Sequence, residues 1–114
     1  MQFFRSQRVA ELIRKELGYF ILREIEVSGA LVTITEVQVS KKLDNAAVLV
    51  SVLPSEKADE ALSVLQKNAG ELQHMLLKKL NIKPLPRIVF ELDSGLEHAA
   101  RVEKLLLEEH NSQE

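Results

Sequence analysis

The sequence predicts a single α+β domain in which helices cover one face of a three-stranded sheet. Two apolar patterns alternate along the chain: long segments with apolar residues every three or four positions, and short segments with alternating or continuous apolar residues. The chain has 114 residues, 46% of them hydrophobic and 28% charged, which suits one globular domain. We expect this domain to span residues 1–114, with a core at about 5–107 and a polar tail at 108–114.

The first helix is expected at about residues 6–25. Its apolar stripe has the spacing of one helical face and consists of Val9, Leu12, Ile13, Leu17, Phe20 and Ile21. Ser28 and Gly29 then provide the turn residues that separate this helix from a strand at residues 31–40.

The strand at residues 31–40 is expected to contain a β-bulge. Its apolar side chains change parity, from Val32 and Ile34 to Val37 and Val39. One extra residue near position 35 returns both pairs to the same face of the sheet.

A polar turn at residues 41–45 leads into a second strand at residues 46–53, so the two strands are expected to form an antiparallel hairpin. The second strand is apolar on both faces, with Val48 and Val50 on one face and Leu49 on the other. That pattern is typical of a central, well-covered strand.

A broken helix is expected at residues 57–80, where the apolar spacing is helical but Asn68, Ala69 and Gly70 interrupt it. Glycine inside a helix costs about 1 kcal/mol relative to alanine, and asparagine prefers caps and turns. The sequence therefore predicts a kink between two helices. Two readings of the kink remain open: its small residues let another backbone approach closely, or Gly70 only lets the two helices turn around the core.

The rest of the chain completes the order of elements. Pro84 and Pro86 prevent the helix from continuing, and residues 87–92 alternate as a third strand. Ser94, with Glu97 three positions later, predicts the start of a last helix. The order α-β-β-α-kink-α-β, with an added C-terminal helix, is that of the type II KH fold, an RNA-binding architecture.

Basic residues are concentrated in the first three quarters of the chain. The formal net charge at pH 7 is −2, but residues 88–114 hold seven acids and two bases, so residues 1–87 carry +3. The short basic clusters in that part are Arg5/Arg8, Arg14/Lys15, Lys41/Lys42 and Lys78/Lys79, followed by Lys83 and Arg87. Such clusters bind phosphates even on an acidic protein, because the local potential governs contact, although solvated helix faces carry similar pairs.

No standard set of catalytic or metal-binding residues occurs in the sequence. The chain has no cysteine, and His74, His98 and His110 do not have the spacing of metal ligands. Nucleophile-elbow and phosphate-loop motifs are absent as well. We therefore expect a protein that is not an enzyme and needs neither a cofactor nor a metal. Because we find no secretory signal and no apolar stretch of membrane length, we expect a cytoplasmic protein without a membrane partner.

Four segments in order carry a family resemblance: residues 8–14 (RVAELIR), 32–40 (VTITEVQVS), 47–53 (AVLVSVL) and 96–98 (LEH). With the helix break between the third and the fourth, they resemble the ribosome-binding factor A family over about residues 5–107. The resemblance implies a KH-like fold in which a helix–kink–helix, commonly Ala-x-Gly, replaces the GXXG clamp. Gly70 matches this motif, whereas Asn68 replaces the alanine and Ala99 stands where the family commonly has glycine.

The resemblance also implies a function. Members of that family bind the free small (30S) ribosomal subunit, contact its 16S rRNA and assist late maturation, including processing at the 5′ end of that RNA. They are linked to growth in the cold, leave the mature subunit and catalyse no reaction. We therefore expect a monomer whose partners are the 30S subunit, 16S rRNA and other assembly factors.

The candidate RNA- and ribosome-binding residues are cations of the first helix, the hairpin turn and the broken helix, together with the kink itself. They are Arg5, Arg8, Lys15, Lys41, Lys42, Lys67, Asn68, Ala69, Gly70, Lys78 and Lys79. We expect contact by charge and shape rather than base stacking, because the chain has only one tyrosine and four phenylalanines, mostly in apolar patterns. The alternative is a protein–protein interaction module without direct RNA contact, which uses a strand edge or the apolar last helix.

Overall fold

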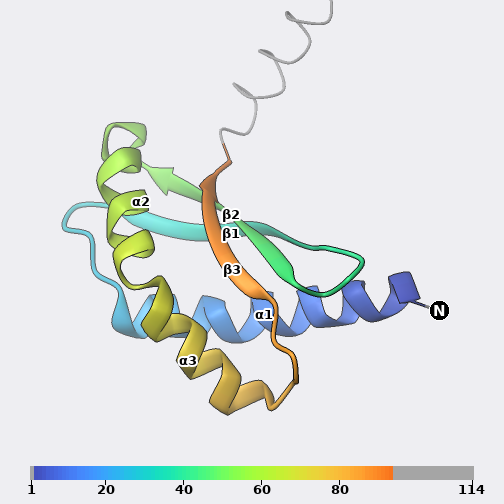
Figure 1. The fold of residues 1–114 in the computed structure, drawn as a ribbon. Coiled ribbons are helices and arrows are strands. Elements are labelled where there is room, and N and C mark those ends of the chain that lie inside the picture. The colour runs from blue at the N-terminus through green and yellow to red at the C-terminus, as the bar shows by residue number, and fades with distance from the viewer. Residues whose placement is uncertain (1, 94–114) are drawn as a thin grey trace, which may run out of the picture.

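The computed structural model describes residues 2–93 as a three-stranded sheet with packed helices (Figure 1). In chain order the elements are α1 (Gln2–Glu24), β1 (Leu31–Val39), β2 (Asn45–Leu53), the short 3-10 helix η1 (Ser55–Lys57), α2 (Ala58–Lys67), α3 (Ala69–Leu80) and β3 (Arg87–Leu92). This order confirms the predicted α-β-β-α-kink-α-β arrangement. The predicted last helix and the polar tail lie outside the described residues.

The start of the first helix differs from the prediction. α1 begins at Gln2 rather than at residue 6, and Ser6 is buried within the helix. Ser6 lies one turn before Val9 on the face that packs against the core, so packing outweighs the modest helix propensity of serine. No helix within residues 2–93 is long and apolar enough to cross a membrane.

The sheet has the strand order β1-β2-β3, with β1 and β2 antiparallel and β2 and β3 parallel. Within the hairpin, Ile34 pairs with Val50 and Glu36 pairs with Leu49, so Thr35 is the extra residue of β1. The predicted bulge is therefore confirmed. It returns the apolar residues that follow it to the face covered by the helices.

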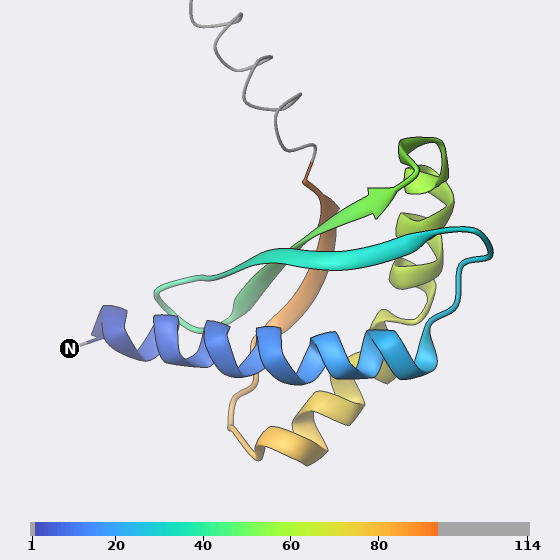
Figure 2. The same cartoon turned by 180° about the vertical axis from the view of Figure 1, so that it is seen from behind.

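The three α-helices pack on one face of the sheet (Figures 1 and 2). α1 lies along β1, whereas α2 and α3 lie along β3. The core takes one apolar stripe from each helix and alternate residues from the strands. Its buried members are Val9, Ile13, Leu17, Phe20, Ile21, Ala46, Val48, Val50, Leu65, Leu72, Leu76, Ile88 and Phe90.

β2 is the central strand, as predicted, but only one of its faces is covered within residues 2–93. Val48 and Val50 are fully buried in the core, whereas Ala47, Leu49 and Ser51 on the opposite face are partly buried. The expectation of cover on both faces is wrong for this part of the chain. The physical reason is that the helices within residues 2–93 all pack on the face of the sheet that carries Val48 and Val50.

Candidate nucleic-acid interface

The kink between α2 and α3 is centred on Asn68. Its backbone N–H donates to Val64 O at 3.1 Å and to Leu65 O at 3.2 Å, and its side-chain Nδ2 donates to Val64 O at 2.8 Å. Asn68 has φ −99° and ψ 4°, so helical geometry ends there and resumes at Ala69. The predicted helix break is therefore confirmed. No side-chain hydrogen bond from Asn68 caps the first turn of α3.

Gly70 is exposed in the first turn of α3, where the fold does not require glycine. A Cβ added at this position meets no atom within 4 Å, and φ of Gly70 is outside the left-handed region. The turn between the helices is made by Asn68. The turn therefore does not depend on glycine at position 70, and the open space there leaves room for another backbone to approach closely.

A cleft of about 390 Å³ lies between the kink and β3. Its walls come from the end of α2, the first turns of α3 and the β3 strand. The lining residues are Gln66, Ala69, Gly70, Gln73, Arg87, Ile88, Val89 and Phe90. This cleft combines small residues, two side-chain amides and one guanidinium, a set that suits the phosphates and hydroxyls of a nucleic-acid backbone.

Gln73 ties α3 to β3 across this cleft. Its Nε2 donates to Pro86 O at 2.8 Å, and Ile88 N donates to its Oε1 at 2.9 Å. Because alanine at position 73 leaves the Ile88 N–H without this acceptor, we expect Gln73→Ala to lower the free energy of unfolding by about 1–3 kcal/mol. Urea denaturation measures the change, and Gln66→Ala, an exposed residue of the same cleft, is the control. Losses of about 0.5 kcal/mol or less in both variants would contradict a supporting role for the bridge.

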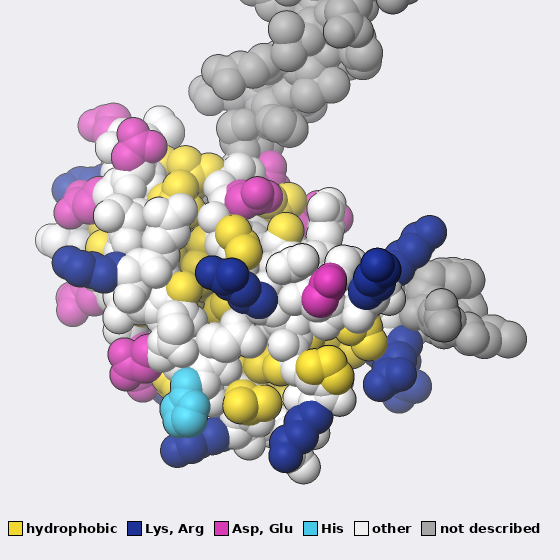
Figure 3. Space-filling model, viewed as in Figure 1, with side chains coloured by type: hydrophobic (Ala, Val, Ile, Leu, Met, Phe, Trp, Pro, Cys, Tyr) yellow, Lys and Arg dark blue, Asp and Glu magenta, His cyan; other side chains and the backbone are white. Residues whose placement is uncertain are grey.

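Eight exposed cations lie at one end of the molecule, which we call the basic end. It is formed by the start of α1, the β1–β2 turn and the segment from the end of α3 to the start of β3. The basic end consists of Arg5, Arg8, Lys41, Lys42, Lys78, Lys79, Lys83 and Arg87. Figure 3, in the view of Figure 1, shows dark blue side chains over the right and lower parts of this face, with others in the centre and at the left, whereas magenta carboxylates lie mainly at the left and the top.

Backbone and side-chain contacts bring these separate segments to the same end. The N–H of Arg87 donates to Asp44 O at 3.0 Å, so β3 begins beside the hairpin turn. The first half of α1 lies against the second half of β1, where Gln7 and Val37 line one cavity. Leu43 from the turn and Leu85 from the loop before β3 pack against the same core. The fold thus joins cations that are up to about 80 positions apart in the sequence.

The hairpin turn is held by hydrogen bonds around Ser40. Ser40 Oγ donates to Asp44 Oδ1 at 2.6 Å and accepts from the backbone N–H groups of Asp44 and Asn45, each at 3.1 Å. The hydrogen bond from Ser40 lowers the pKa of Asp44, and the positive charge of Lys42 acts in the same direction. Asp44 therefore stays ionised at neutral pH, and it is the only carboxylate within the segments that form the basic end.

Most of the predicted site residues fall into two regions of the structure. The basic end contains Arg5, Arg8, Lys41, Lys42, Lys78 and Lys79, and the kink contains Asn68, Ala69 and Gly70 with Lys67 exposed beside it. Lys15 belongs to neither region, because it lies about two helical turns beyond Arg8 on α1.

The sequence-based site omits four residues that the structure adds. Lys83 and Arg87 could have been included from the sequence, because they follow the Lys78/Lys79 pair closely in one basic run. Gln66 and Gln73 gave no signal, because glutamine on an amphipathic helix is ordinarily a solvated residue. Within residues 2–93, no three His, Asp or Glu side chains are grouped closely enough to hold a metal ion.

Comparison with known proteins shows the family to which the chain belongs. The family model described as ribosome-binding factor A matches residues 5–106. A ribosome-binding factor A from Desulforamulus reducens is 38% identical over 112 residues, which cover 96% of this chain and 92% of that protein. The chain belongs to the ribosome-binding factor A family.

Structures of the ribosome-binding factor A family share this fold. A crystal structure of the Thermus thermophilus protein matches with a TM-score of 0.65 and 22% identity, covering 76% of this chain and 94% of that one. Coordinates of the Thermus thermophilus factor fitted into a cryo-EM map of a 30S–RbfA complex match with a TM-score of 0.62 and 24% identity, covering 72% and 88%. The predicted α+β, KH-like fold class and the family resemblance are therefore confirmed.

Proposed function

We propose that this member of the ribosome-binding factor A family binds the free 30S ribosomal subunit and its 16S rRNA as an assembly factor. The observation that carries the proposal is the basic end, which has eight exposed cations and a single carboxylate, Asp44. Arg87 of the basic end also lines the kink cleft. The fitted Thermus thermophilus coordinates support it, because that relative is described in a complex with the 30S subunit.

The finer role rests on the family resemblance. In this proposal the protein assists late maturation of the subunit, including processing at the 5′ end of 16S rRNA, beside other assembly factors. It acts in the cytoplasm as a monomeric single domain, supports growth in the cold and catalyses no reaction. Its contribution is to hold an RNA junction by charge and shape.

In this proposal, phosphate contacts at the basic end provide the affinity for RNA, and the shape of the kink cleft matches the RNA backbone. Arg87 belongs both to the basic end and to the lining of the kink cleft. An RNA backbone that crosses the basic end therefore enters the cleft beside the Arg87 side chain. The first turn of α3 offers its N–H dipoles to a phosphate, and Gly70 leaves space for close approach. Each neutralised phosphate releases counterions, so affinity falls steeply with salt.

Cosedimentation with immature and mature 30S subunits at two salt concentrations tests the proposed function. We expect preferential migration with immature particles and weaker binding at the higher salt concentration. Equal migration with both particles, unaffected by salt, would contradict the proposal and favour a module that binds only protein. A mobility-shift measurement with naked 16S rRNA then separates direct RNA contact from contact with ribosomal proteins.

Gly70→Ala is expected to separate stability from binding. The substitution should raise the free energy of unfolding by up to about 1 kcal/mol, because alanine favours the helix and its Cβ meets no atom within 4 Å. Affinity for immature subunits should nevertheless fall roughly tenfold, the effect of a steric cost of about 1.4 kcal/mol, because the Cβ occupies space that the RNA backbone needs. Thermal unfolding and cosedimentation measure the two effects.

Gly18→Ala is the matched control for Gly70→Ala. Gly18 lies in α1, and a Cβ there also meets no atom within 4 Å. We expect a similar gain in stability with unchanged affinity. Unchanged affinity in both variants, or an equal loss in both, would show that no RNA backbone approaches the kink closely.

A further inference from the structure

Three exposed leucines lie together at the end of the sheet opposite the basic end. Leu22, Leu31 and Leu53 are 72%, 56% and 63% exposed, and we name these three residues the leucine patch. They come from the end of α1, the start of β1 and the end of β2, and Leu31 pairs with Leu53 in the hairpin. Contiguous exposed apolar side chains of this kind mark interaction surfaces.

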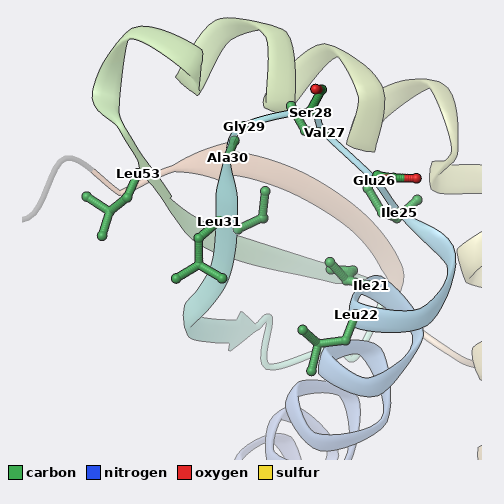
Figure 4. Close-up of a pocket in the computed structure, with 11 residues that line it drawn as sticks. Ile21, Leu22, Ile25, Glu26, Val27, Ser28, Gly29, Ala30, Leu31 and Leu53 are labelled. Atoms are coloured by element: carbon green, nitrogen blue, oxygen red, sulfur yellow. The ribbon is translucent and has the colours of Figure 1, made fainter.

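The leucine patch borders a groove of about 620 Å³ between the end of α1, the loop after it and the hairpin. Figure 4 shows the side chains of Leu22, Leu31 and Leu53 projecting from three different elements around this groove. A second groove of about 280 Å³ shares Leu22 and Leu31 and continues between α1 and β1 past the exposed Tyr19. The apolar surface is therefore an elongated track, long enough for a segment of chain rather than a single side chain.

The chain leaves the sheet at the same end as the leucine patch. β2 and β3 are parallel, so both strands finish there. The N–H of Asp93 donates to Val50 O at 2.7 Å, which lies three residues before Leu53, or about 10 Å along the strand. Thr35 Oγ1 also donates to Asp93 Oδ2 at 2.6 Å. This hydrogen bond holds Asp93, where the chain leaves the sheet, against the β1–β2 hairpin.

The residues that follow have the composition to cover this track. Residues 94–114 include Leu96 and the run Leu105, Leu106 and Leu107. Leu106 lies thirteen positions after Asp93, a separation that spans about 20 Å even if helical, so the run reaches the patch. This segment holds five acids and two bases, and Arg14 lines the second groove. The charge of the segment is therefore complementary to Arg14 in the second groove, whereas Glu26, the one charged residue that lines the first groove, has the same sign as the acids of the segment.

We propose that the leucine patch is the docking site of this chain's own residues 94–114, with the run at residues 105–107 covering Leu22, Leu31 and Leu53. Docking removes the exposed leucine surface from water, which is the driving force. The docked segment leaves the basic end free, because the patch and the β1–β2 turn lie at opposite ends of the hairpin. The docking is therefore independent of RNA binding.

Leucine methyl NMR of the full-length protein tests this inference. We expect Leu106→Asp combined with Leu107→Asp to move the methyl resonances of Leu22, Leu31 and Leu53 toward those of solvated leucine. Ser112→Asp combined with Gln113→Asp adds the same charge to the same segment and should leave these resonances in place. In the converse full-length variant, Leu31→Asp with Leu53→Asp should move the methyl resonances of residues 105–107.

The methyl resonances of Ile13 and Ile88, both in the core, report whether each variant remains folded. Patch resonances that do not move in the folded Leu106/Leu107 variant overturn the inference, as does an equal movement in the control variant. Patch resonances that change with protein concentration identify a second copy of the chain as the occupant and overturn it as well. Patch resonances that move only when 30S subunits are added assign the patch to the subunit and likewise overturn it.

Discussion

Phe90→Ala is expected to lower the free energy of unfolding by about 3–5 kcal/mol. Phe90 is 2% exposed and is paired with Val48 in the sheet. It belongs to the same core cluster as Leu65 and Leu72, so its removal leaves a cavity between β3 and both halves of the broken helix. Since globular domains are stable by only about 5–15 kcal/mol in total, this single change removes a large share of the stability.

Urea denaturation followed by circular dichroism measures the effect of Phe90→Ala. The control is Val89→Ala, at the neighbouring position of β3, where the side chain is 45% exposed on the opposite face. We expect the control to change the free energy of unfolding by about 0.5 kcal/mol or less. Similar losses in the two variants would mean that β3 does not pack its Phe90 face against the helices as described.

Reversal of three charges at the basic end is expected to abolish subunit binding at physiological salt. Lys78→Glu, Lys79→Glu and Arg87→Glu replace three phosphate contacts with repulsion, so affinity for immature 30S subunits should fall by roughly a hundredfold or more. The slope of log affinity against log salt should become shallower by about two to three. All three side chains are exposed, so the fold should be retained.

A second triple variant tests whether the loss of binding comes from the basic end or only from the change in net charge. Lys15→Glu, Arg23→Glu and Lys57→Glu change the net charge by the same amount, but these residues lie outside the basic end. We expect this variant to lose much less affinity and to keep the original salt slope more closely. Equal losses in the two triple variants, measured by cosedimentation with circular dichroism as the folding check, would refute the assignment of the basic end.

Local features of the fold were accessible from sequence patterns. The change of parity between Ile34 and Val37 predicted the bulge, because side chains alternate strictly along a strand. Asn68 and Gly70 predicted the helix break, because both disfavour the interior of a helix. The start of α1 was placed four residues late, because the packing of Ser6 depends on the rest of the core.

The candidate site was less accessible from sequence. The individual basic clusters were visible, but nothing in the sequence distinguished Lys15, which lies apart, from Lys41 or Lys78, which lie at the basic end. For a related reason, the sequence did not indicate that Gln66 and Gln73 line the kink cleft. Their role comes from the approach of β3 to α3, as in the Gln73 bridge to Pro86 and Ile88.

The helices, the strands, the bulge and the kink could be predicted from sequence patterns, because each depends on apolar periodicity and backbone preference over a few neighbouring residues. The three-dimensional structure was needed to see which charges share the basic end, which leucines form the patch and which face of β2 is left partly open. Those features depend on strand register and on the parallel return of β3 beside β2, which bring distant segments together. Contacts between distant segments leave no periodic trace in the sequence of either one.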